Sequence, residues 1–173
     1  MVVGQMSRPQ FFVVWRITIY NRVDYMPFNN IKLVSLNVNG LNNPIKRSKV
    51  VTKLKKEKAQ VIFLQETHLP QQEHEKLKRF GYKNTYYNSY RQSQKRGVAI
   101  LIANSVQFEC HKEVSDKEGR YLLIKGKLEN KLVTLVNIYA PPGSKKSDYK
   151  DLFNLVTQES EGLVICAGDY NVV

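Results

Sequence analysis

Apolar and polar residues follow regular spacings from residue 31 onward, and these spacings predict strands alternating with helices. Short apolar or alternating stretches predict six β-strands, at residues 31–37, 60–65, 97–103, 121–128, 131–139 and 162–167. Apolar residues at helical spacing predict helices at residues 44–58 and 147–160, the second with Ser147 as its N-cap, and a polar helix is expected at residues 71–80. This order of elements, without repeats or low-complexity segments, predicts an α/β domain.

Residues 1–30 do not continue this pattern. Their apolar stretch from Phe11 to Tyr20 is interrupted by Arg16 and is too short to span a bilayer. It also lacks the strongly basic start and the small-residue cleavage site of a signal peptide. We therefore expect a poorly ordered leader over residues 1–30, one domain over residues 31–173, and no membrane association.

An excess of positive charge bears on the expected partner. The chain has 27 Lys and Arg against 15 Asp and Glu, a formal net charge of +12 over 173 residues. This excess favours a polyanion, because neutralising phosphates releases counterions, although ribosomal, membrane-surface and merely soluble basic proteins share it. The two cysteines form no paired motif, and no N-glycosylation motif occurs. These features suit a reducing compartment and a protein that is not secreted.

Two basic segments leave their interpretation open. Lysines surround the apolar positions of the helix predicted at residues 44–58, where a solvent-exposed face explains most of them. Tyrosines and cations alternate between Tyr82 and Arg96. Such a mixture suits a nucleic-acid surface, but tyrosines at a strand edge are at least as common.

Polar residues end or follow four of the predicted strands. They are Asn37, Glu66, Tyr139 and Asp169, with Asn171 two residues further on. Each has a simple structural explanation: a turn amide, a helix N-terminal charge, a packing aromatic or a loop acid. Taken together, they favour a site at one edge of a sheet, where α/β proteins bind ligands.

The types of these side chains favour a hard cation. Carboxylate and amide oxygens without paired Cys or His suit Mg²⁺. This ion usually takes one or two protein carboxylates, and Glu66 and Asp169 are side chains of that type. His68, His74 and His111 have no zinc-type spacing, so we expect solvated histidines. No glycine-rich phosphate loop, nucleophile elbow or dinucleotide motif occurs. A basic domain with such a site points to cleavage of phosphodiesters or phosphomonoesters.

Five motifs in order resemble the endonuclease/exonuclease/phosphatase superfamily, in its apurinic/apyrimidinic endonuclease-like branch. They are SLNVNGL at 35–41, LQETHL at 64–69, RGVAILI at 96–102, NIYAPPG at 137–143 and GDYNV at 168–172. The residues of LQETHL, GVAILI and YAPP are most similar to those of the endonuclease domain of long interspersed element (non-LTR) retrotransposons. The resemblance implies a four-layer α/β sandwich that cuts DNA with Mg²⁺ or Mn²⁺, and a nuclear protein. No stable protein partner can be inferred from it.

The resemblance also assigns roles around the metal. It makes Glu66 the principal metal carboxylate and Asn37 an amide of the metal shell or an orienting group for the phosphate. It makes Asp169 the group that activates the attacking water, next to the metal, and Asn171 the amide that positions this water. The physical logic agrees, because cleavage of an anionic phosphodiester needs stabilisation of added negative charge and an acceptor for the proton of water.

Three further residues receive substrate roles from the resemblance. Tyr139 is implied to hydrogen-bond the scissile phosphate through its phenol. Asn39 occupies a position where some relatives carry Asp, and is implied to contact nucleic acid or metal. Arg120 is implied to contact the DNA backbone.

The family pattern extends beyond the motifs found here, to a Ser-Asp-His motif near its carboxyl end. The 173 residues do not include this motif. We therefore expect only the N-terminal part of the sandwich, mainly its first sheet and helices, with the inner face of that sheet bare. Negligible DNA nicking by this chain alone follows as a second expectation.

Three rival functions share the same residues. An exodeoxyribonuclease III-type or apurinic/apyrimidinic repair nuclease differs only in sequence beyond these motifs. A non-catalytic remnant would bind nucleic acid through its charge alone. A phosphatase of the same superfamily would act on lipid or inositol headgroups, which the basic tyrosine segment disfavours mildly.

Overall fold

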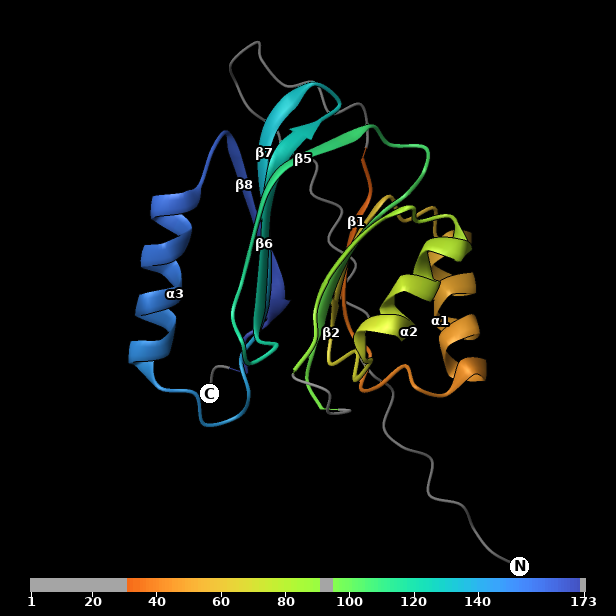
Figure 1. The fold of residues 1–173 in the computed structure, drawn as a ribbon, viewed down its shortest axis with the longest axis horizontal. Coiled ribbons are helices and arrows are strands. Elements are labelled where there is room, and N and C mark those ends of the chain that lie inside the picture. The colour runs from red at the N-terminus through yellow and green to blue at the C-terminus, as the bar shows by residue number, and fades with distance from the viewer. Residues whose placement is uncertain (1–30, 91–94, 172–173) are drawn as a thin grey trace, which may run out of the picture.

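Two β-sheets pack face to face between outer helices, in four layers (Figure 1). The computed structural model describes residues 31–90 and 95–171, so the predicted leader lies outside the described residues. The first sheet has the order β1 (Leu33–Asn37), β2 (Val61–Gln65), β4 (Val98–Ile102), β3 (Asn84–Asn88). The second has the order β5 (Phe108–Ser115), β6 (Tyr121–Leu128), β7 (Lys131–Tyr139), β8 (Leu163–Asp169). The predicted α/β sandwich is thereby confirmed.

The helices form the two outer layers. The first sheet is covered by α1 (Pro44–Lys56), by the short α2 (Gln71–Glu75) and by a 3₁₀ turn, η1 (Lys76–Phe80). The second sheet is covered by α3 (Lys146–Glu159) (Figure 1). No helix of the described segments is long and apolar enough to cross a bilayer.

The expectation of a bare inner face on the first sheet is wrong. The two sheets share one apolar core, in which Val61, Phe63 and Ile100 of the first sheet pack with Leu122 and Leu135 of the second. The strands from residue 108 onward form a four-stranded partner sheet, so strands of both inner layers of the sandwich are present. Burial of this face removes the aggregation hazard that an open apolar sheet would create.

Two strands were missed and one helix start was misplaced. β3 and β5 were not predicted because they carry many polar residues, and most of β5 is exposed or half-exposed. α3 begins at Lys146, and its N-cap is Lys145 rather than Ser147. The Asp148 carboxylate accepts from the Lys145 backbone N–H at 3.2 Å, so the helix is capped two residues earlier than it would be with Ser147 as N-cap.

Helix α1 begins with a side-chain cap and packs one apolar face inward. Asn43 Oδ1 accepts from the backbone N–H groups of Ile45 and Lys46, and Pro44 occupies the first turn. Arg47 corrects the interpretation of this helix's cations as solvent-exposed. Its side chain is buried, its Nε donates to the Leu41 carbonyl at 2.9 Å, and its Nη1 lies 2.8 Å from a Glu73 oxygen. The loop after β1 is thereby tied to α2.

A buried amide joins the two sheets. Asn137 of β7 accepts from Gln65 Nε2 at 2.7 Å and donates to the carbonyl oxygens of Leu64 and Ala99 at 2.9 and 2.8 Å. Both Asn137 and Gln65 are almost fully buried. Since buried polar groups stabilise a fold only when they are satisfied, this contact fixes the register of one sheet on the other.

His74 is buried rather than solvated, which corrects the expectation for this residue. Its ring stacks on Tyr87 with centroids 4.6 Å apart. Nε2 lies 2.9 Å from Thr67 Oγ1, and Nδ1 lies 3.1 Å from Ser89 Oγ. Both ring nitrogens therefore have hydrogen-bond partners in the interior. One of these partners, Thr67, is the residue that follows Glu66 in the sequence.

Acid should destabilise the fold through His74. Burial lowers the pKa of His74 from 6.5 to about 4. As pH falls from 6.5 towards 4, the unfolded chain takes up a proton that the native chain does not, so the unfolding free energy falls by about 3 kcal/mol. Urea unfolding at neutral pH and at about pH 4.5 measures this loss. His74→Gln, which does not titrate, should lose less over the same interval; equal losses would contradict the assignment.

Candidate metal and phosphate site

One amide nitrogen brings two carboxylates together. Asn37 Nδ2 donates to Glu66 Oε1 and to Asp169 Oδ2, both at 2.8 Å. Asn37 ends β1, Glu66 follows β2 and Asp169 ends β8. Because β1 is parallel to β2 and β8 is parallel to β7, these strand ends lie at one edge of the sandwich. The predicted convergence is present, and both carboxylates are within reach of one cation.

Tyr139 adds a phenol beside these carboxylates. It ends β7, pairs in register with Asp169, and is 8% exposed. Burial first, and then the negative charge of Glu66 and of Asp169, raises the pKa of Tyr139 to about 12. The phenol therefore stays protonated at neutral pH and can donate a hydrogen bond to an anionic oxygen.

The two remaining predicted amides support the cluster through hydrogen bonds. Asn171 donates from Nδ2 to the Ala140 carbonyl at 2.9 Å, and its backbone N–H donates to Asp169 Oδ1 at 3.3 Å. The backbone N–H of Asn39 donates to Asn37 Oδ1 at 3.0 Å. The Asn37 amide is thereby oriented with its nitrogen towards the carboxylates.

Unusual backbone conformations concentrate around this edge. Five of the eight described non-glycine residues with positive φ belong to its loops: Asn39, Glu66, His68, Arg96 and Asn171. Left-handed φ in non-glycine residues is held by surrounding structure and clusters at functional sites. Gly168 has φ of 156°, and a Cβ there would lie 2.1 Å from the Ile138 carbonyl oxygen, so only glycine can precede Asp169 in this arrangement.

Two nitrogen-bearing side chains at the site, His68 and Arg96, were not predicted. His68 Nε2 lies 3.3 Å from Glu66 Oε2, so His68 is not the freely solvated histidine that was expected. Arg96 is close enough to Tyr139 to oppose the rise of its pKa, and it forms an ion pair with Glu118 at 2.9 Å. The sequence did hold a signal for both residues. His68 lies two residues after Glu66, and Arg96 lies two residues before β4, so both belong to loops at the same edge of the sheet as the carboxylates.

The tyrosine-rich segment contributes mainly to packing. Tyr82 is buried, Tyr86 packs against the core between the sheets, and Tyr87 stacks on His74. Tyr90 lies under the Arg96 guanidinium, whose Cζ is 4.9 Å from the ring centroid. Most of the tyrosines that the structure describes in this segment therefore pack within the fold, as expected for tyrosines of a strand, and do not form a surface for nucleic acid.

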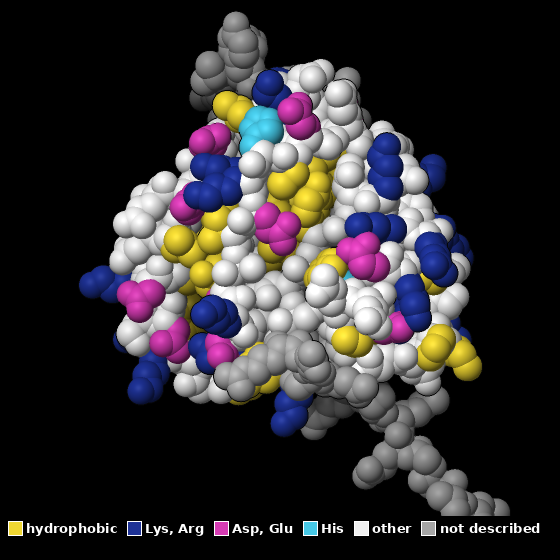
Figure 2. All heavy atoms as spheres, in the orientation of Figure 1, with side chains coloured by type: hydrophobic (Ala, Val, Ile, Leu, Met, Phe, Trp, Pro, Cys, Tyr) yellow, Lys and Arg dark blue, Asp and Glu magenta, His cyan; other side chains and the backbone are white. Residues whose placement is uncertain are grey.

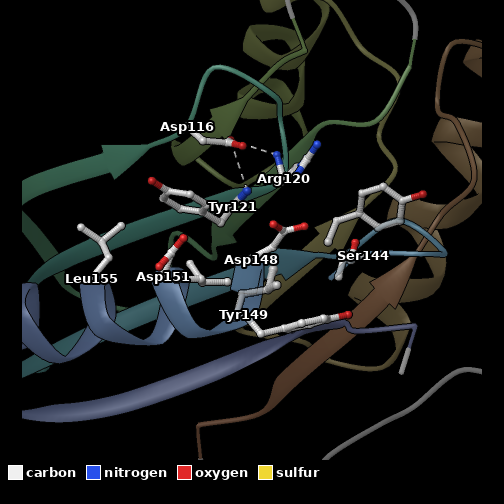
Figure 3. A pocket seen from close by; sticks show the side chains of 12 residues that line it. Asp116, Arg120, Tyr121, Ser144, Asp148, Tyr149, Asp151 and Leu155 are labelled. Atoms are coloured by element: carbon white, nitrogen blue, oxygen red, sulfur yellow. Dashed lines mark hydrogen bonds between the residues drawn. The ribbon is translucent and has the colours of Figure 1, made fainter. Parts of the chain in front are cut away.

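Arg120 and Tyr139 line the same cavity behind the carboxylates. The Arg120 side chain lines this cavity of about 430 Å³ between β6, β7 and α3, together with Asp148, Asp151 and Tyr149 (Figure 3). Arg120 Nε is buried without a hydrogen-bond partner in the part of the chain that the structure describes. Its backbone carbonyl accepts from the Tyr139 N–H at 2.6 Å, so Arg120 borders the site through the main chain.

The sequence from residue 34 to residue 173 matches the model of the Endonuclease/Exonuclease/phosphatase family. The chain belongs to this family. Nucleases of the endonuclease/exonuclease/phosphatase family act on phosphodiester bonds and generally depend on a divalent metal.

Individual relatives extend well beyond the length of this chain. The Xenopus laevis protein described as "Transposon TX1 uncharacterized 149 kDa protein" is 28% identical over 144 residues, which are 82% of this chain and 11% of that protein. An AP endonuclease from Archaeoglobus fulgidus has a TM-score of 0.60 at 23% identity, over 82% of this chain and 58% of that one. D. rerio TDP2 complexed with a single-strand DNA product has a TM-score of 0.62 at 20% identity, over 82% and 60%. The two structures show the shared fold.

The donor set of this family member suits a hard divalent cation. Glu66 and Asp169 supply carboxylate oxygens, and Mg²⁺ typically takes one or two carboxylates and fills its remaining positions with water and phosphate. Among the described residues, no group of three or more His, Cys, Asp and Glu side chains is placed to hold a metal.

Proposed function

We propose that this chain carries the metal-binding part of a retroelement-type DNA endonuclease that hydrolyses phosphodiester bonds with Mg²⁺ or Mn²⁺. The observation that carries the proposal is the bridge of Asn37 between Glu66 and Asp169, beside the protonated phenol of Tyr139. Similarity to a transposon protein supports the retroelement origin. The net charge of +12 supports a polyanionic substrate.

In this proposal Asp169 has two tasks and the other side chains have one each. Glu66 and Asp169 would hold the metal, which would supply charge neutralisation for the phosphate and the leaving oxygen. Asn37 holds the two carboxylates in place through its nitrogen. Tyr139 donates to a non-bridging phosphate oxygen. Asp169, oriented by Asn37 and by the Asn171 backbone, accepts the proton of the attacking water.

Asn39 and Arg120 have smaller proposed roles. Asn39 is exposed at the rim, where its side chain can meet a phosphate while its backbone N–H orients Asn37. Arg120 borders the site behind Tyr139 through its main chain, and its half-exposed side chain is the group that we propose contacts the DNA backbone. A repair-type nuclease remains the second candidate, supported by the fold shared with the AP endonuclease. Matched duplexes with and without an abasic site separate the two, since a repair enzyme needs the lesion.

The 173-residue chain should nick DNA at least about a hundredfold more slowly than a family member that contains the Ser-Asp-His motif. Loss of one transition-state donor commonly costs a hundred- to a thousandfold in rate, and groups that act as a unit cost more. Nicking of supercoiled plasmid with Mg²⁺ or Mn²⁺ measures the rate. Glu66→Gln is the control for contaminating nucleases. Robust nicking that Glu66→Gln abolishes would contradict the expected inactivity but support the proposed chemistry.

A further inference from the structure

A groove of about 520 Å³ lies at the opposite end of the first sheet from the carboxylates. Gln60, which lines this groove, precedes β2, whereas Glu66 follows it. The groove is bordered by the end of α1, by the turn between η1 and β3, and by the turn after β4. It shares no lining residue with the proposed metal site.

The groove offers hydrogen-bond donors and no carboxylate. Six donor-bearing side chains line it: Lys55, Lys58, Gln60, Tyr82, Asn104 and Ser105. The Gln60 side-chain oxygen is occupied by the Lys32 backbone N–H at 3.0 Å, and the Asn104 oxygen by the Lys83 N–H at 2.8 Å. Their amide nitrogens are the groups left to bind a ligand, so the lining favours an oxyanion.

Several of these donors lack a partner within the described residues. Lys55 and Lys58 are exposed, and the ion pairs of the described chain include neither. Tyr82 is 2% exposed, yet its hydroxyl makes no hydrogen bond in the described segments. Burial raises the pKa of Tyr82, so the phenol remains a donor. Among the described residues, Arg120 Nε is the one buried side-chain polar atom without a partner, so the Tyr82 hydroxyl is reached by solvent from the groove and can donate to a bound oxyanion.

A row of lysines favours a long polyanion over a single small anion. The positions of Lys46, Lys49, Lys53 and Lys56 place them along one face of α1. Lys46 Nζ donates to the Asn39 carbonyl at 2.7 Å beside the metal site, and the helix ends near the groove, about 20 Å away. Figure 2 shows Lys and Arg side chains on the side of the molecule where α1 lies, and others on the side where α3 lies.

The helix dipole explains only part of this arrangement. Basic residues in the last turn of α1 favour its negative end, which accounts for Lys55 without any ligand. Lys58 lies beyond the helix in a left-handed conformation, with φ of 54°. Asn104 and Ser105 come from a separate turn after β4. The convergence of donors from three segments needs a different explanation.

We propose that this groove binds the sugar–phosphate backbone of a nucleic acid, as a second contact remote from the metal site. The inference rests on the proposed function only in taking nucleic acid as the partner. Binding there requires no metal. The groove therefore anchors the nucleic acid, whereas the carboxylate edge acts on it.

Binding of a labelled DNA duplex in EDTA, followed by fluorescence anisotropy over a range of salt concentrations, tests the groove. Lys55→Gln/Lys58→Gln should weaken binding about tenfold near 0.1 M salt and reduce the slope of log K against log salt by about two. Lys127→Gln/Lys150→Gln removes the same charge from two exposed lysines of β6 and α3. This control should bind within about twofold of the parent chain. Thermal melts check that both variants fold.

Equal binding by the two double variants would overturn the proposal, because net charge alone would then explain affinity. Competition by inorganic phosphate for the groove, with duplex affinity unaffected by Lys55→Gln/Lys58→Gln, would also overturn it in favour of a small-anion site. Glu66→Gln in the same EDTA assay should leave the difference between the two double variants unchanged. Since Mn²⁺ affinity is measured separately, failure of the groove is distinguishable from failure of the metal site.

Discussion

Replacing Glu66 with glutamine will lower the affinity for Mn²⁺ by about a hundredfold or more. The substitution removes one of two carboxylates but keeps the shape of the side chain and an acceptor for Asn37 Nδ2. Loss of an outer-shell partner alone commonly costs ten- to a hundredfold in metal affinity, so loss of a direct carboxylate should cost at least as much. Titration calorimetry, or the loss of the free Mn²⁺ signal in electron paramagnetic resonance, measures the change.

The matched control for this effect is Glu109→Gln. Glu109 is an exposed residue of β5, and the substitution removes the same single negative charge. Its Mn²⁺ affinity should match that of the parent chain. If both variants lose affinity equally, the effect comes from the overall charge of the chain, and Glu66 is not a ligand.

Asn137→Ala will lower the unfolding free energy by about 2–4 kcal/mol. The substitution removes three hydrogen bonds between the sheets, deprives the buried Gln65 amide of one partner and leaves a small cavity. Urea unfolding gives the difference between the variant and the parent chain. The control is Asn154→Ala on the exposed side of α3, which should change stability by no more than about 0.5 kcal/mol. Similar losses in both variants would show that Asn137 does not join the sheets.

The carboxylate edge was predictable because its residues interrupt strongly apolar strands. Glu66 follows five buried residues of β2, and Asp169 ends the last strand, so a change from apolar to polar marks each position. Parallel pairing of β1 with β2 and of β7 with β8 then brings the ends together. Their functional roles remain predictions.

The missed features depend on contacts between segments far apart in the chain. β5 has a weak apolar signal because most of its side chains are exposed or half-exposed. The other three strands of the second sheet were predicted, but the chain was expected to contain mainly the first sheet. Asn137 and Gln65 resemble ordinary polar residues until the two sheets are packed together. His74 belongs to a polar segment, QQEHE, and only the packing of α2 on Thr67 and Tyr87 buries it.

The central claim, that Glu66 and Asp169 share one ion, is tested most directly by a double-mutant cycle of Mn²⁺ binding. Parent chain, Glu66→Gln, Asp169→Asn and the double variant would be titrated under the same conditions. Each single variant should lose most of the affinity of a single site, and the double variant should lose little more, because both substitutions damage the same coordination sphere. Fully additive losses, or parent-like affinity in either single variant, would show that the two carboxylates do not hold a common cation.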